Sequence, residues 1–173
     1  MPSRPPGLEY HTFTAIARCP ETGKLGIATA TRSLAVGSRV PHVRSRLGAV
    51  AIMAIADPRL GETALKFLEM GYKAPGVIQE LVEADPQHEY RQLGVIDADG
   101  FAAARTGKHN RDWAGHHVRD NFIALGNVLV GEHVLDAIEA GYNAQPSLPF
   151  EERLMLALEA GRDAGGQHGG QNS

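Results

Sequence analysis

The apolar positions of the chain follow two patterns, one typical of strands and the other of amphipathic helices. Short, nearly continuous apolar runs predict strands, and the run over residues 48–56 suits a central strand covered on both faces. The predicted strands are residues 11–17, 24–31, 48–56, 90–96, 101–106 and 122–129. Apolar residues at helical spacing predict helices over residues 62–71, 74–84, 131–141 and 149–164.

Tight turns are predicted between consecutive strands. Pro20 presets φ in the turn of residues 20–23, and Gly23 takes the position that needs a positive φ. Residues 97–100 form a second hairpin turn, and residues 57–61 are expected to be a loop. Hairpins outnumber βαβ crossovers in this order. The pattern therefore predicts an α+β protein with antiparallel sheets rather than a Rossmann fold, whose glycine motif is also missing from the sequence.

Composition narrows the class of protein. The chain has 173 residues, 43% of them hydrophobic, which suits one globular domain with a real core. A formal charge of -3 does not indicate a nucleic acid or an anionic membrane as partner. The sequence has no apolar run of membrane-spanning length and no secretory signal in residues 1–10, so a cytoplasmic location is expected. Residues 1–11 are expected to be a leader that is flexible or removed.

Several kinds of catalytic or metal site find little support. Cys19 is the only cysteine, which excludes an intramolecular disulfide and a Cys-rich zinc site, and its setting predicts a turn residue. The eight histidines lack metal-ligand spacing, so we expect neither a metal nor another cofactor. The Gly-x-Ser-x-Gly motif is missing, and Ser33 and Ser38 have no evident base nearby in the sequence.

Thr12 is the candidate nucleophile. It stands at the start of the first predicted strand, after a proline-rich segment that shows no fold signal. A threonine with a free α-amine needs no separate histidine, because the amine has a pKa near neutrality and takes the proton of the hydroxyl. The alternative is that Thr12 is only a β-branched strand residue.

A series of short motifs supports the catalytic interpretation. In order they are residues 12–18, 20–23, 34–37 with Pro41, 56–59, 84–86, 91–97, 106–107, 113–116, 126–127, 160–161 and 164–166. In this order and spacing the chain resembles, from Thr12 to its C-terminus, the bacterial and archaeal family called domain of unknown function 1028, which is grouped with the N-terminal-nucleophile (Ntn) hydrolases.

The resemblance implies a four-layer αββα sandwich, with two antiparallel sheets face to face and helices on both outer faces. It also implies cleavage of an amide or related C–N bond through an acyl-enzyme on the terminal side chain, but it supplies no substrate. Members of the family typically begin at the Thr of a Thr-Phe-Ser sequence. Thr12 matches that residue, and Thr14 replaces the serine.

One departure from the family pattern concerns the amine itself. Eleven residues precede Thr12, so its nitrogen belongs to a peptide bond and cannot act as a base. Three alternatives follow: the His11–Thr12 bond is cut, autocatalytically or otherwise; the chain is a precursor; or Thr12 is not catalytic here.

Other site residues are assigned by their chemistry. A cation beside the nucleophile lowers the pKa of the α-amine and stabilises an oxyanion, and Arg32 is placed best for this role, with Arg44 or Arg46 as substitutes. The alternative is that Arg32 is only a surface arginine of a loop. Asn127 could donate an amide N–H to the oxyanion, or it could form an Asx turn. The residues expected to line a substrate pocket are Ser33, Asp57, Arg59, Trp113 and His116. Trp113 and His116 could instead pack a loop, and Ser33 is an alternative nucleophile.

The sequence thus predicts an Ntn-type hydrolase that cleaves an amide-like or imine C–N bond of a small molecule or peptide. The alternative is a binding or assembly protein that keeps the fold without catalysis. A homo-oligomer is expected because Ntn relatives often associate through their helical layers. The domain is expected to span residues 12–173, and the glycine-rich residues 165–173 suggest that a C-terminal strand and helix are lacking, which would leave a sheet edge to be covered.

Overall fold

The computed structural model describes residues 9–111 and 113–172, which form strands, helices and two short 3-10 turns. The strands are β1 (Glu9–Tyr10), β2 (Thr12–Arg18), β3 (Leu25–Thr31), β4 (Pro41–Arg44), β5 (Gly48–Ile55), β6 (Arg91–Asp97), β7 (Ala102–Thr106), β8 (Gly115–Arg119) and β9 (Phe122–Gly126). The helices are α1 (Pro58–Glu69), α2 (Ala74–Ala84), α3 (His133–Asn143) and α4 (Phe150–Asp163), and the 3-10 turns are Val36–Ser38 and His88–Tyr90.

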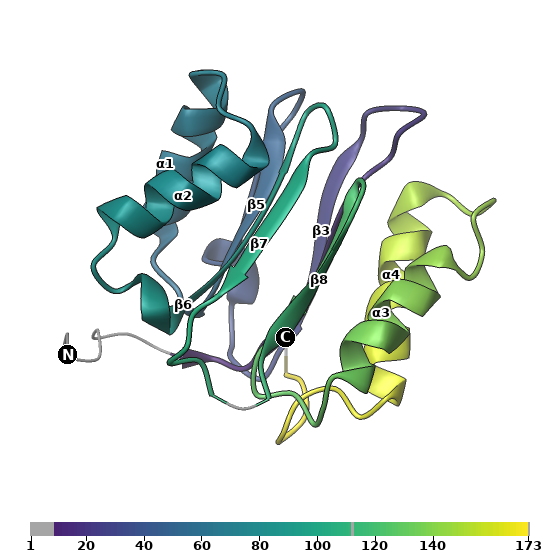
Figure 1. Ribbon diagram of the computed structural model, residues 1–173. Coiled ribbons are helices and arrows are strands. Elements are labelled where there is room, and N and C mark those ends of the chain that lie inside the picture. Colours follow the sequence, from purple (N-terminus) through teal and green to yellow (C-terminus); the bar gives the residue numbers. More distant parts are fainter. Residues whose placement is uncertain (1–8, 112, 173) are drawn as a thin grey trace.

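The strands form two antiparallel sheets. The first sheet has the order β1-β5-β6-β7, with β4 also paired to β5, and the second has the order β3-β2-β9-β8. The predicted α+β class with antiparallel sheets is therefore confirmed. In Figure 1 the two sheets face each other, with α1 and α2 against the outer face of the first sheet and α3 and α4 against the outer face of the second.

Apolar side chains fill each space between these layers. Fully buried residues from both sheets meet in the central layer, among them Ile16, Met53, Ile123 and Leu125. The sheets come close together at Gly94, where an added Cβ would lie 2.7 Å from the side chain of Ile16. Every residue of β5 is buried, as its continuous apolar run predicts for a strand covered on both faces.

The structure corrects the predicted start of the first long helix. Residues 58–61 were expected in a loop, but α1 already begins at Pro58. Asp57 caps this helix by accepting a hydrogen bond from the backbone N–H of Arg59 at 3.0 Å, and proline is well tolerated in the first turn of a helix. The expected strand 122–129 ends at Gly126, and β4 and β8 have no predicted counterpart because their polar residues conceal the strand pattern.

Many strand ends meet at one end of the sandwich, the lower end in Figure 1, which we call the Thr12 end. The residues at these strand ends are Thr12, Thr31, Ile55, Arg91, Thr106, Gly115 and Gly126. The hairpin turns at residues 19–24, 97–101 and 119–122 lie at the opposite end. The topology thus brings residues from distant parts of the chain to one place.

The glycine-rich residues after α4 fold back onto the Thr12 end. Gln167 forms an isolated bridge with Leu129 and is 2% exposed. Farther along, the backbone N–H of Asn172 donates to the carbonyl of Thr31 at 2.8 Å. The tail is therefore held against the ends of β3 and β9.

Candidate functional site

Thr12 lies fully buried at the first position of β2. The register of the β2–β3 hairpin places it opposite Thr31, the last residue of β3. The hydroxyl of Thr12 donates a hydrogen bond to the hydroxyl of Thr31 at 3.1 Å. The nucleophile predicted from the sequence thus has a hydroxyl partner, and sequence reasoning missed that partner although the turn at residues 20–23 fixes the pairing.

The carbonyl of His11 precedes Thr12 and accepts two hydrogen bonds. The Thr31 hydroxyl donates to the His11 oxygen at 2.8 Å, and the backbone N–H of Arg32 donates to it at 3.2 Å. Two donors on one carbonyl oxygen polarise the carbonyl and stabilise negative charge on that oxygen. Thr31 therefore contacts both the candidate nucleophile and the carbonyl of the peptide bond that holds its nitrogen.

Asn127 reaches Thr12 through its backbone. Its N–H donates to the carbonyl of Thr12 at 2.9 Å. Its side chain instead donates through Nδ2 to Oε1 of Gln92 at 3.1 Å, so in this state it does not point a donor at a reacting group. The Oδ1 atom is buried without a hydrogen-bond partner among the described residues. Next to it, Val128 has a φ of 57°, a costly conformation for a β-branched residue and one that concentrates at functional sites.

Gln92 is the polar centre of the Thr12 end, and the sequence analysis missed it. It is fully buried on β6, and the two hydrogens of its Nε2 are shared among three acceptors at 2.8–3.0 Å, the hydroxyl of Thr106 and the carbonyls of Gly115 and Gly126. Its Oε1 accepts from Asn127. The side chain thus ties the first sheet to the second, since β6 and β7 belong to one and β8 and β9 to the other.

His116 continues this network. Its Nδ1 lies 2.9 Å from the hydroxyl of Thr106. The direction of this hydrogen bond follows the protonation of Nδ1, because an unprotonated Nδ1 accepts from the hydroxyl and a protonated Nδ1 donates to it. Burial lowers the pKa of His116 below its ordinary value, and the charge of His117 lowers it further.

A cleft of about 460 Å³ opens at Thr106 and His116. Trp113 lines it, and the ring of Trp113 lies over Gly115, where an added Cβ would be only 2.3 Å away. Trp113 also packs against the apolar layer between the second sheet and its helices. Trp113 thus lines a cleft and packs against this layer, and its contact with a substrate stays a prediction.

Arg32 and Ser33 follow directly after β3. The backbone N–H of Ser33 donates to the Thr31 hydroxyl at 3.2 Å. The side chain of Arg32 is exposed, and an added Cβ at Gly169 would lie 2.7 Å from its Nη1. Both residues thus follow Thr31, the residue whose hydroxyl bonds to Thr12. The two substitute cations lie elsewhere. Arg44 pairs with Glu69, and Arg46 lies in the turn between β4 and β5. This turn is at the end of β5 away from Ile55, and therefore away from the Thr12 end.

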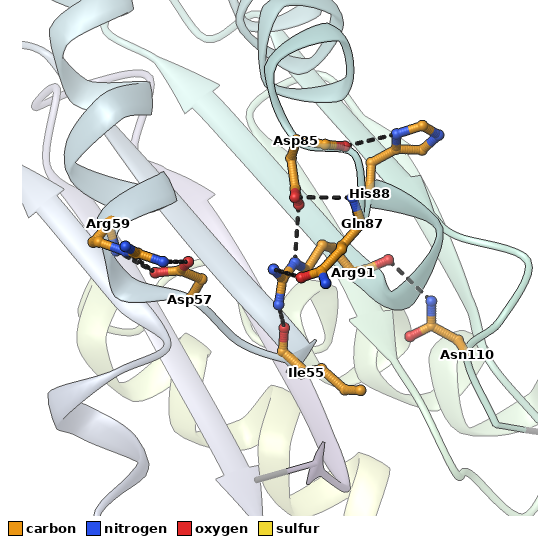
Figure 2. A network of polar contacts seen from close by, with 8 residues as sticks. All are labelled: Ile55, Asp57, Arg59, Asp85, Gln87, His88, Arg91 and Asn110. Atoms are coloured by element: carbon orange, nitrogen blue, oxygen red, sulfur yellow. Dashed lines mark hydrogen bonds and ion pairs between the residues drawn. The ribbon is translucent and has the colours of Figure 1, made fainter. Parts of the chain in front are cut away.

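Asp57 and Arg59 pair with each other. Figure 2 shows their side chains facing, with Nη2 of Arg59 2.7 Å from Oδ2 of Asp57. This hydrogen bond lowers the pKa of Asp57 below its ordinary value. Because Asp57 also caps α1, and 90% of the Arg59 side chain is exposed, the pair is explained by the start of the helix.

A buried ion pair forms the centre of Figure 2. Nε of Arg91 lies 2.9 Å from Oδ2 of Asp85, and the guanidinium also donates to the carbonyl of Ile55. Asn110 donates to the backbone carbonyl of Arg91 at 2.9 Å. This network joins the end of β5, the start of β6 and the segment after α2, and so it fixes the strand ends on which the site depends.

Other parts of the molecule lie apart from this site. A larger cavity, about 710 Å³, opens at the opposite end of the second sheet, where Arg18, Cys19 and Phe122 contribute to its lining. Among residues 9–111 and 113–172 we find no group of three His, Cys, Asp or Glu side chains that could hold a metal ion. Within the same residues, every helix is too short or too polar to cross a membrane.

Comparisons with known proteins agree with one another. The family model described as "Family of unknown function (DUF1028)" matches residues 12–173. The crystal structure of protein SPO2555 from Silicibacter pomeroyi, assigned to the same family model, is similar with a TM-score of 0.85 and 37% sequence identity. The match covers 88% of this chain and 68% of that one. No curated protein matches the sequence significantly.

Proposed function

The chain belongs to the DUF1028 family, whose function is unknown, and on that premise we propose that it is an Ntn-type hydrolase with Thr12 as its nucleophile. The reaction is the cleavage of an amide-like or imine C–N bond. Two antiparallel sheets between pairs of helices, with a threonine at the start of a central strand of one sheet, support this proposal. The fold is then the αββα sandwich of the Ntn superfamily.

The contact that carries the proposal is the triad of His11, Thr12 and Thr31. The hydroxyl that would attack and the carbonyl that would be attacked share Thr31 as a hydrogen-bond partner, at 3.1 Å and 2.8 Å. The backbone N–H of Arg32 is the second donor to the same carbonyl oxygen. Thr29 makes the same kind of contacts with the Thr14 hydroxyl and, at 3.4 Å, with the carbonyl of Phe13, so the proposal depends on the shorter contact at His11 and on the position of Thr12 at the start of β2.

The arrangement suits release of the Thr12 amine by an internal acyl shift. The hydroxyl oxygen of Thr12 attacks the carbonyl carbon of His11, and the hydroxyl proton passes to the Thr12 nitrogen. The C–N bond breaks and leaves an ester between His11 and Thr12. One water molecule then hydrolyses the ester, giving a carboxylate on His11 and a free amine and hydroxyl on Thr12.

The freed amine then acts as the general base. It takes the proton of the Thr12 hydroxyl as the oxygen attacks the substrate's acyl carbon, and the nitrogen-containing product leaves with a proton. Water hydrolyses the resulting ester and regenerates Thr12. The amide group of Asn127, next to Thr12, is our candidate for contacting the oxyanion once the substrate is bound.

Intact-mass spectrometry of the purified full chain tests the proposal. We expect a species that begins at Thr12, and we expect the Thr12→Ala chain to stay uncut while the Thr12→Ser chain is cut. An active sample in which residues 1–11 remain attached would overturn the free-amine mechanism. The alternative of a binding protein without catalysis is favoured by one observation, the full burial of Thr12 in the uncut chain.

A further inference from the structure

Arg32 differs from other arginines at the Thr12 end in its charge partners. Arg59, Arg91 and Arg105 each pair with a carboxylate, namely that of Asp57, Asp85 and Glu89 respectively. Within the described part of the chain, the guanidinium of Arg32 has no such partner, and its side chain is exposed. A cation that faces solvent beside a candidate nucleophile is open to an anionic ligand.

The backbone of Arg32 is fixed from two sides. Its N–H donates to the carbonyl of His11, and its carbonyl accepts from Nδ2 of Asn172 at 3.0 Å. Because the tail also bonds to Thr31, the backbone from which this side chain extends is fixed beside His11 and Thr31. Gly169 leaves room for it, since a larger residue there would contact Nη1.

The segment after Arg32 exposes an apolar side chain before it returns to the core at Val36. The apolar side chain of Leu34 is 75% exposed. Ala35 has a φ of 58°, a strained conformation for a residue with a Cβ and one that concentrates at ligand-binding segments. An exposed aliphatic side chain close to an unpaired guanidinium suits a ligand with an aliphatic part and an anionic end.

We propose that Arg32 binds a carboxylate of the substrate, so that the substrates of the Thr12 site are amides whose acyl part carries a terminal carboxylate. This inference rests on the proposed function. A guanidinium holds a carboxylate by two parallel charge-assisted hydrogen bonds, which gives both affinity and orientation. The acyl carbonyl of such a substrate is then directed to Thr12 while Leu34 contacts the aliphatic chain.

Two chromogenic amides test this selectivity. Glutaryl-p-nitroanilide and pentanoyl-p-nitroanilide have acyl chains of equal length and differ only in the terminal carboxylate. In each, Thr12 forms an ester with the acyl group, p-nitroaniline leaves with a proton, and water hydrolyses the ester. We expect the glutaryl compound to have a kcat/KM roughly tenfold or more above that of the pentanoyl compound. Arg32→Gln should bring this ratio close to one, and Arg32→Lys should restore part of it.

A binding measurement separates the two proposals. The ¹⁵N–H resonance of Nε of Arg32 in the full chain, identified by its loss in Arg32→Lys, should shift with glutarate and not with the neutral glutaramide. Hydrolysis of both anilides at equal rates without this shift would overturn the carboxylate site and leave the hydrolase proposal standing. A glutarate shift without any hydrolysis would overturn the hydrolase proposal and leave the carboxylate-binding site standing. If neither is observed, both proposals fail.

Discussion

The hydroxyls of Thr12 and Thr31 lie 3.1 Å apart, on facing positions of one β-hairpin. Thr31 also donates to the carbonyl of His11 at 2.8 Å. One side chain thus holds both the attacking and the attacked group of the proposed cleavage, and this relationship makes the proposal open to direct test.

Thr31→Val keeps the shape of the side chain and removes the three hydrogen bonds of its hydroxyl, to Thr12, His11 and the N–H of Ser33. We expect cleavage of the His11–Thr12 bond to slow by about 100-fold or more, because one of the two donors to the developing oxyanion is lost. The rate is followed by mass spectrometry of freshly made protein.

Thr29→Val is the matched control, because Thr29 forms the equivalent pair with Thr14 two positions along the same strands, at 2.7 Å. Both variants should lose about 1–3 kcal/mol of unfolding free energy, since each leaves a buried hydroxyl without its partner. Only Thr31→Val should slow the cleavage, and equal cleavage rates in the two variants would contradict the role given to Thr31.

Gln92→Leu should destabilise the protein strongly. The variant removes the side-chain partner of the buried amide of Asn127, of the buried carbonyl of Gly126 and of the half-buried carbonyl of Gly115. We expect a loss of about 2–4 kcal/mol in the free energy of unfolding, measured by urea denaturation. Gln79→Leu is the control: Gln79 is exposed on α2, and its substitution should cost less than about 0.5 kcal/mol.

His116 should make stability depend on pH below neutrality. Its pKa is lowered in the folded protein, so the unfolded chain binds more protons there and stability rises with pH. The contribution is present above the ordinary pKa of 6.5 and is lost as the pH falls through the lowered value. His116→Asn should flatten this part of the unfolding curve. A pKa above 6.5 for His116, measured by NMR, would refute the prediction.

Arg91→Met should be among the most damaging single substitutions. It leaves the carboxylate of Asp85 buried without its guanidinium, which typically costs about 3–5 kcal/mol. The double variant with Asp85→Leu should recover part of this loss, because neither charge then remains. Arg162→Met removes half of an exposed pair with Asp163 and should cost less than about 1 kcal/mol. A similar cost for Arg91→Met would show that the buried pair contributes little.

The sequence predicts the elements well where one local cause decides them. The periodicity of α2 and the continuous run of β5 both give elements whose bounds the structure matches closely. The start of α1 was wrong because Asp57 and Pro58 suggest a loop as readily as a helix cap. β8 stayed hidden because His116 and His117 interrupt any apolar alternation.

The residues of the candidate site also differ in whether the sequence could identify them. Thr12 could be named because its chemistry depends on its own place in the chain. Thr31 could have been found by counting back from the turn at residues 20–23, since a hairpin fixes its own register. Gln92 could not be found, because it lies in an apolar run and its partners come from strands of both sheets, up to 35 positions away.

The short strand β1 gives the proposed cleavage a direction. Glu9 and Tyr10 pair with Ile55 and Ala54 in the first sheet, whereas Thr12 belongs to the second. While the chain is continuous, this pairing benefits from the high effective concentration of a tethered segment. Once the His11–Thr12 bond is cut, the same pairing becomes an encounter between separate molecules, and among the described residues it involves the 2 residues of β1. Dilution then favours dissociation of the cut peptide, so the proposed cleavage is not reversed by re-binding of the peptide.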